Sequence, residues 1–147
     1  MTAVRRVLAA TATLAGLGAM TGCGPASVGE STLARADDGT YVMLVEICRG
    51  KPEVVVLTID DLWEAEAPDA GRSYAVVLSG LDVSAVPRDE DLYVGGWTED
   101  INHTLYGPNV SAGEVADLRP GELFALDDDG DYRATTTTEA DWRADAC

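Results

Sequence analysis

The 147-residue chain carries 26 acidic and 10 basic residues, which gives a formal net charge of −16 at pH 7. A surface this acidic repels the phosphates of nucleic acids and the headgroups of anionic lipids, so nucleic-acid binding is excluded. The length fits a signal segment followed by one domain with a single core.

The N-terminal segment has the layout of a bacterial export signal. Arg5 and Arg6 precede an uncharged run over 7–20 that is rich in Ala, Leu and Val, as in secretory signals. This run is shorter than the roughly 20 apolar residues of a transmembrane helix. Gly22 and Cys23 follow it with the spacing of a lipoprotein lipobox.

We therefore expect residues 1–22 to be cleaved as a lipoprotein signal peptide and Cys23 to become a lipidated N-terminus. The alternative is a plain signal peptide that is cleaved elsewhere, with Cys23 a bystander. The small, polar composition that follows predicts that residues 23–39 are the lipidated N-terminus and a flexible tether. Residues 40–147 are then predicted to form a single β-rich domain.

Six segments in the first part of this domain are predicted as strands, because they are rich in β-formers and are bounded by turn residues. They are 41–48, 53–59, 62–66, 73–78, 91–98 and 101–106. Gly95 and Gly96 inside the fifth segment predict a bulge or a close approach of backbones. Trp63 is expected to anchor the core, and a role in stacking against carbohydrate is the alternative.

The next part of the domain is predicted to contain one helical turn and two strands. Ser111 and Glu114 have the spacing of a capping box, which favours a single helical turn after Ser111. Strands are expected over 122–126 and 132–136, joined by an acidic hairpin turn.

The C-terminal end is predicted to be a short helix over 139–147. Thr138 and Asp141 again have capping-box spacing. Trp142 and Ala146 are four residues apart, so they share one face of the helix and can lie on the sheet. The pattern of short strands with regular turns predicts a mainly β fold, an antiparallel immunoglobulin-like β-sandwich with this short C-terminal helix.

One local motif resembles the immunoglobulin family. Asp128, Gly130, Tyr132 and Ala134 have the spacing of its Asp-x-Gly-x-Tyr-x-Cys corner. Ala134 stands where that family has a cysteine, so the usual disulfide between the two sheets cannot form.

The cysteines predict one disulfide. If Cys23 carries lipid, Cys48 and Cys147 are the two that remain. An even number of cysteines in an exported protein indicates a bond, and this one would dock the terminal helix on the first predicted strand. The alternative is two free thiols.

No catalytic residues are predicted. His103 is the only histidine, so a histidine-rich metal site is excluded, and the serines lack the Gly-x-Ser-x-Gly setting of a nucleophile. Asp127, Asp129 and Asp131 are weak candidates for Ca²⁺ ligands, because hard oxygen ligands surround a glycine there. An acidic hairpin tip that binds no metal is the favoured interpretation, and no cofactor is expected.

As a whole, the chain resembles a broad group of small lipoproteins of high-GC Gram-positive bacteria. The matching features are the lipobox at Cys23, Cys-Arg-Gly at 48–50, the segment 119–124 and a capped terminal helix that ends in Cys147. The resemblance implies a location on the extracytoplasmic face of the cell membrane, with lipid as the anchor, and it supplies no catalytic residues.

The expected function is that of a non-enzymatic binding or envelope-interaction module. Its partner would be an envelope protein or a glycan, and we expect a monomer. The alternative is an extracytoplasmic hydrolase that uses carboxylates. A pocket with two close carboxylates of raised pKa would favour the hydrolase, whereas an open apolar or aromatic patch would favour the binding module.

Overall fold

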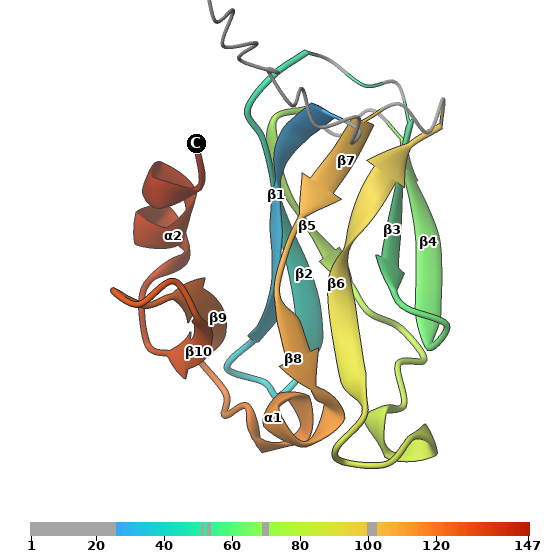
Figure 1. The fold of residues 1–147 in the computed structure, drawn as a ribbon, viewed down its shortest axis with the longest axis vertical. Helices are drawn as coiled ribbons and strands as arrows, with labels where there is room; N and C mark the ends of the chain where they lie inside the picture. The colour runs from blue at the N-terminus through green and yellow to red at the C-terminus, as the bar shows by residue number, and fades with distance from the viewer. Residues whose placement is uncertain (1–25, 51, 53, 69–70, 100–102) are drawn as a thin grey trace, which may run out of the picture.

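The structure, a computed structural model, describes residues 26–50, 52, 54–68, 71–99 and 103–147. The lipidation site predicted at Cys23 and the signal segment lie outside these residues. The described chain is mainly β and ends in a short helix, as predicted (Figure 1). Its strands are β1 (Ala26–Arg35), β2 (Tyr41–Ile47), β3 (Val54–Ile59), β4 (Trp63–Pro68), β5 (Ser73–Val77), β6 (Asp91–Thr98), β7 (His103–Tyr106), β8 (Asn109–Ser111), β9 (Leu123–Leu126) and β10 (Tyr132–Thr135).

Both predicted helical segments are confirmed. The helices are α1 (Ala112–Asp117) and α2 (Glu139–Ala146), and a short 3₁₀ turn, η1 (Val83–Ala85), precedes β6. Ser111 and Glu114 form the reciprocal capping box of α1. The Thr138 hydroxyl caps α2 by accepting a hydrogen bond from the backbone N–H of Asp141. None of the helices in the described residues is long and apolar enough to span a membrane.

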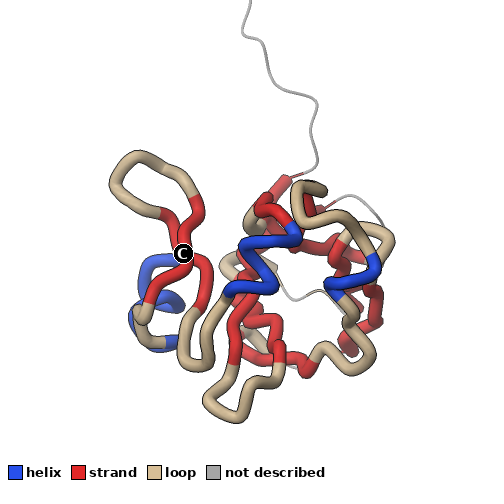
Figure 2. The backbone as a smooth tube through the Cα atoms, turned by 90° about the horizontal axis from the view of Figure 1, so that it is seen from below, coloured by secondary structure: helices blue, strands red, loops and turns tan. Residues whose placement is uncertain are grey.

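The strands form one mixed, barrel-like sheet. Its main order is β5–β2–β1–β7–β6–β3–β4, in which β1 and β7 are parallel and the other neighbours are antiparallel. Viewed from below, these strands curve around a common interior (Figure 2). The immunoglobulin-like sandwich is not confirmed, because β1 links the strands on both of its sides into a single sheet instead of leaving two separate layers.

The predicted tether over 23–39 is wrong for residues 26–35, which form the central strand β1. Its residues Ser31, Thr32 and Leu33 are all at most 1% exposed. The Thr32 hydroxyl donates to the carbonyl oxygen of Phe124 at 2.6 Å, and the Ser31 hydroxyl donates to the carbonyl oxygen of Tyr106 at 3.4 Å. A strand with polar residues is stable in the core because other strands satisfy their hydroxyls.

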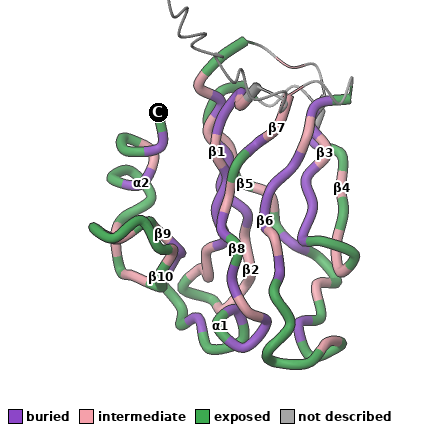
Figure 3. Tube along the Cα trace, viewed as in Figure 1, coloured by how far each residue is buried: buried purple, intermediate pink, exposed green. Residues whose placement is uncertain are grey.

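The main core lies inside the sheet, and the strands around it carry buried stretches (Figure 3). Side chains from β1, β2, β3, β6 and β7 point inward, and the core is mostly aliphatic. The fully buried members include Leu33, Met43, Val45, Leu57, Val94 and Leu105.

A second, smaller core lies outside the sheet, under α2. We call it the outer cluster; it consists of Leu44, Leu123, Trp142 and Ala146. Trp142 and Ala146 share the inner face of α2, as their spacing predicts, and Trp142 is 5% exposed. The hairpin of β9 and β10 joins β1 through the pair Ala34 and Leu123, so it forms one wall of this cluster.

The close backbone approach predicted at Gly95 and Gly96 is confirmed at Gly96. A Cβ added to Gly96 would collide with the carbonyl oxygen of Val56 on β3. At Gly95 the close neighbour is a side chain: an added Cβ would lie 2.5 Å from the ring of Tyr93, so the missing side chain leaves room for this ring.

Candidate functional site

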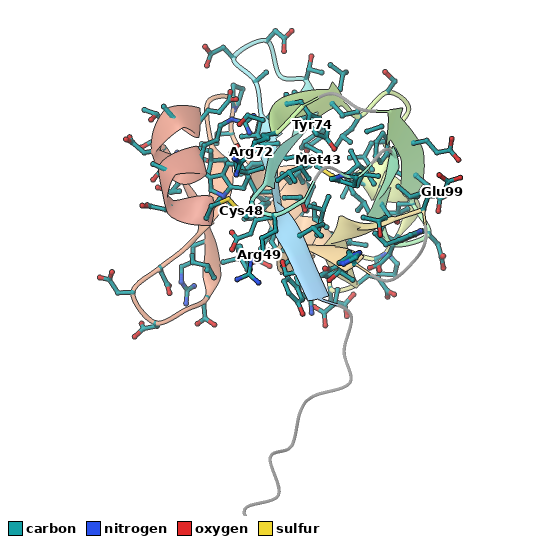
Figure 4. All side chains as sticks on the ribbon, turned by 90° about the horizontal axis from the view of Figure 1, so that it is seen from above. Met43, Cys48, Arg49, Arg72, Tyr74 and Glu99 are labelled. Carbon is teal, nitrogen blue, oxygen red and sulfur yellow. A yellow bond between two sulfur atoms is a disulfide. The ribbon has the colours of Figure 1, made fainter. Side chains whose placement is uncertain are left out.

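The predicted disulfide between Cys48 and Cys147 is present, with 5.4 Å between the two Cα atoms. Cys48 follows β2 directly and Cys147 follows α2. Figure 4 shows the bond between the sheet and the terminal helix. The bond therefore fixes the end of α2 on the sheet, while Trp142 fixes its middle.

A second anchor of α2 is Arg143, whose side chain is 16% exposed. Its guanidinium donates to the carbonyl oxygens of Val45 at 2.6 Å and Tyr74 at 3.0 Å, which belong to paired strands β2 and β5. It also forms ion pairs with Glu46 at 3.1 Å and with Glu139 one helical turn away at 2.7 Å. These bonds use most of the five guanidinium donors, so Arg143 is a structural residue.

The C-terminal region leaves a groove against the outer face of the sheet, with a volume of about 420 Å³. Its floor is apolar and comes from β1, β2 and β5, and its wall is the segment 136–138 that precedes α2. The rim carries Asp37, Glu122 and Glu139. Glu139 forms an ion pair with Arg143, and the Glu122 carboxylate accepts a hydrogen bond from the backbone N–H of Arg119. Both carboxylates therefore stabilise the local structure.

The acidic hairpin between β9 and β10 is a tightly bonded turn. The Asp127 carboxylate accepts the backbone N–H groups of Asp129 and Asp131 at 3.0 and 2.9 Å and pairs with Arg133 at 2.6 Å. The hydrogen bond from Asp131 and the one from Arg133 hold the pKa of Asp127 below its usual value. Within the described residues, no group of three or more Asp, Glu, His or Cys side chains is arranged to hold a metal ion.

His103 lies in strand β7, within the segment 101–106 that was predicted as a strand, and is half-buried. Trp63 is half-buried at the start of β4 and packs against the main core, as expected of a core anchor. Its indole N–H donates to the carbonyl oxygen of Ser79 at 3.1 Å.

Three tyrosines and a glutamate from different strands come near one another on another part of the sheet. We call this the tyrosine face; it consists of Tyr93 on β6, Tyr106 on β7, Tyr132 on β10 and Glu30 on β1. Glu30 and Tyr106 are direct neighbours in the parallel register of β1 and β7. The Tyr93 hydroxyl donates to the carbonyl oxygen of Leu105 at 3.0 Å, so its ring extends from β6 across to β7.

The electrostatics indicate that these four side chains lie close together. Burial raises the pKa of Tyr93, and the nearby phenol of Tyr106 adds to the increase. Burial also raises the pKa of Tyr132, with further contributions from the charges of Glu30 and Tyr93. The pKa of Glu30 is itself raised by burial. The phenols of Tyr93 and Tyr132 are therefore neutral at pH 7 and can both donate and accept hydrogen bonds.

The face and the hairpin beside it are partly open to solvent. Tyr106 is 51% exposed and Leu126, paired with Tyr132 in the β9–β10 hairpin, is 54% exposed. These are two of the three exposed large hydrophobic side chains in the described residues. An exposed apolar patch with polar groups among it is typical of a binding surface.

No family model, curated protein or solved structure matches this chain. The tyrosine face could not be predicted from the sequence, because its residues are far apart along the chain and come together only through the pairing of β1 with β7, of β7 with β6 and of β1 with the β9–β10 hairpin. One pattern in the sequence points to this face. Tyr93 and Gly95 are two residues apart, so they lie on the same face of a strand, and the glycine has no side chain to displace the ring of Tyr93.

Proposed function

We propose that this chain is an extracytoplasmic binding module, anchored in the membrane by lipid on Cys23, that binds an envelope polysaccharide through its tyrosine face. The observation that carries the proposal is the meeting of Tyr93, Tyr106 and Tyr132 around Glu30. Aromatic rings pack against the C–H faces of sugar rings, while phenols and a carboxylate hydrogen-bond to the sugar hydroxyls. The net charge of −16 favours a neutral chain over an anionic one.

The arrangement of carboxylates supports binding over hydrolysis. Glu30 faces Glu46 across β1 and β2. However, Glu46 accepts hydrogen bonds from Ser73 at 2.6 Å and from Arg143 at 3.1 Å. A two-carboxylate hydrolase needs both groups available to the substrate. The tyrosine face offers one such carboxylate, together with the rings of a binding surface.

The first prediction concerns Tyr106. Tyr106→Ala should weaken binding to insoluble cell-wall polysaccharide by at least about tenfold, because the variant loses the most exposed ring of the face. The measurement is co-sedimentation of purified residues 24–147 with the polysaccharide. Tyr106→Trp retains a ring and should bind, and Asp89→Ala, in an exposed connection, should bind like the wild type.

The same samples separate the two functions. A binding module leaves the polysaccharide intact, so the soluble fraction should contain no new reducing sugar ends after prolonged incubation. Release of reducing ends that stops in Glu30→Gln would support the hydrolase instead, and equal sedimentation of Tyr106→Ala would remove the tyrosine face from the binding site.

The second prediction concerns the anchor. Mass spectrometry of the protein made in a high-GC Gram-positive host should find a diacylglyceryl group on a peptide that begins at Cys23. The prediction rests on Arg5, Arg6, the apolar run and the Gly22-Cys23 junction. An unmodified Cys23 inside a longer N-terminal peptide would contradict lipid anchoring and leave the tyrosine face unaffected.

A further inference from the structure

The barrel-like sheet is open along one side, between β4 and β5. Within the described residues β4 pairs with β3, and β5 pairs with β2, but no ladder joins β4 to β5. These strands are consecutive in the chain and run in opposite directions, so the sheet begins and ends at neighbouring edges. We call the space between them the seam.

The main core is less well covered at the seam than elsewhere. Inward side chains on β2, β3 and β6 are buried completely, as Met43, Leu57 and Val94 show. Ala67 on β4 and Leu78 after β5 are buried, but five other side chains beside the seam are only partly buried, although they pack on the same core. These are Leu62, Trp63, Tyr74, Val76 and Leu81. Tyr74 lies at this side of the sheet (Figure 4), and burial raises its pKa to about 12.

The backbone of β5 presents hydrogen-bonding groups to the seam. The Ile47 N–H donates to the carbonyl of Arg72, and the Leu78 N–H donates to the carbonyl of Tyr41. Because bonded pairs alternate in an antiparallel ladder, even-numbered residues of β5 bond to β2. The N–H and C=O groups of Ser73, Ala75 and Val77 therefore point away from β2, as at an edge strand.

At the end of the seam where β4 begins, a side-chain hydrogen bond links β4 to the residues that follow β5, and no backbone ladder is present there within the described residues. The Trp63 indole N–H reaches the carbonyl oxygen of Ser79 at 3.1 Å. On the other edge, Glu64 and Glu66 alternate with Ala65 and Ala67, so both glutamates face outward and are exposed. Val77, outward on β5, is 55% exposed.

We propose that the seam accepts an extended segment of a partner protein as an added β-strand. The segment alternates small apolar side chains, which cover the partly buried residues of the core, with Lys or Arg, which face Glu64 and Glu66. Main-chain hydrogen bonds to Ser73, Ala75 and Val77 supply affinity, and the alternation supplies specificity. This surface is separate from the tyrosine face, so the inference does not depend on the proposed polysaccharide.

The probe is a synthetic peptide in which Lys and Val alternate over eight residues. We expect saturable binding by calorimetry at physiological salt, and slower amide hydrogen exchange at Ala75 and Val77 in the complex. A block peptide with four Lys followed by four Val has the same charge, and a peptide with Glu for each Lys has the opposite charge. Both should bind at least about tenfold more weakly.

Two variants test the mode of binding. Ala75→Pro removes an N–H that points into the seam without removing a bond to β2, so it should lower the affinity at least about tenfold. Glu64→Lys/Glu66→Lys changes two exposed side chains and should reverse the preference, so that the Glu peptide binds better. This second variant keeps the test valid if Ala75→Pro fails to fold.

Three results would overturn the proposal. Equal affinity for the alternating and block peptides would show that binding depends on the charge of the peptide and not on a strand-like alternation. Full affinity in Ala75→Pro would place the peptide elsewhere. A dimer of the wild type in solution that Ala75→Pro converts to a monomer would assign the seam to a second copy of this chain.

Discussion

Replacing Cys147 by serine should lower the melting temperature of the domain by about 10–15 °C. The disulfide joins residues 99 positions apart, and closing a loop of this length stabilises the folded state by on the order of 4–5 kcal/mol in the chain-entropy model. The loss should be cooperative, since α2 is far shorter than helices that are stable alone in water. Calorimetry of wild type and variant gives the difference directly.

Two controls make this result specific to the bond. Reduction of the wild type with a thiol reagent should reproduce the shift, and Asp145→Ser, an exposed change on the same helix, should have little effect. Trp142 should also become accessible to a fluorescence quencher in Cys147→Ser, because it is 5% exposed only while α2 is docked. An unchanged melting temperature after reduction would contradict this role of the disulfide.

Arg143→Met should destabilise the domain by about 2–4 kcal/mol. The substitution leaves Glu46, whose side chain is 14% exposed, without its cation, and it removes donors to the carbonyls of Val45 and Tyr74. Removing one partner of a largely buried ion pair is costly, because the remaining charge stays desolvated. Chemical denaturation of the oxidised protein measures the change in the free energy of unfolding.

A double-mutant cycle separates the charge from the packing of Arg143. Glu46→Gln in the Arg143→Met background should recover part of the lost stability, since no unpaired carboxylate then remains under the helix. Glu139→Gln is the matched control: Glu139 is 54% exposed, so its pair with Arg143 should contribute at most about 1 kcal/mol. Equal effects of Arg143→Met and Glu139→Gln would show that the contacts of Arg143 with the sheet do not contribute to stability.

Much of the local structure could be predicted from the sequence, because it depends on short-range signals. β2 and β3 have dense β-branched residues, and the hydroxyls of Ser111 and Thr138 cap their helices at the predicted places. The disulfide followed from the number of cysteines and the expected compartment.

The arrangement of the sheet could not be predicted in this way. β1 is a central strand although Ser31 and Thr32 lie in it, because the carbonyls that accept their hydroxyls come from residues 75 and 92 positions later. No local pattern encodes such partners. The tyrosine face and the seam also depend on the pairing of strands that are far apart in the sequence, so neither could be recognised without the structure.

The parallel pairing of β1 and β7 also bears on how the chain folds. β1 can form a hairpin with β2 soon after both are synthesised, but its other edge has to wait for β7 and β9. Such high contact order slows folding, because loop closure must precede the contacts that stabilise it. If the chain crosses the membrane from its N-terminus, the central strand arrives first and remains half-paired until β7 and β9 follow. Chaperones or the membrane surface then have a defined edge to protect during that interval.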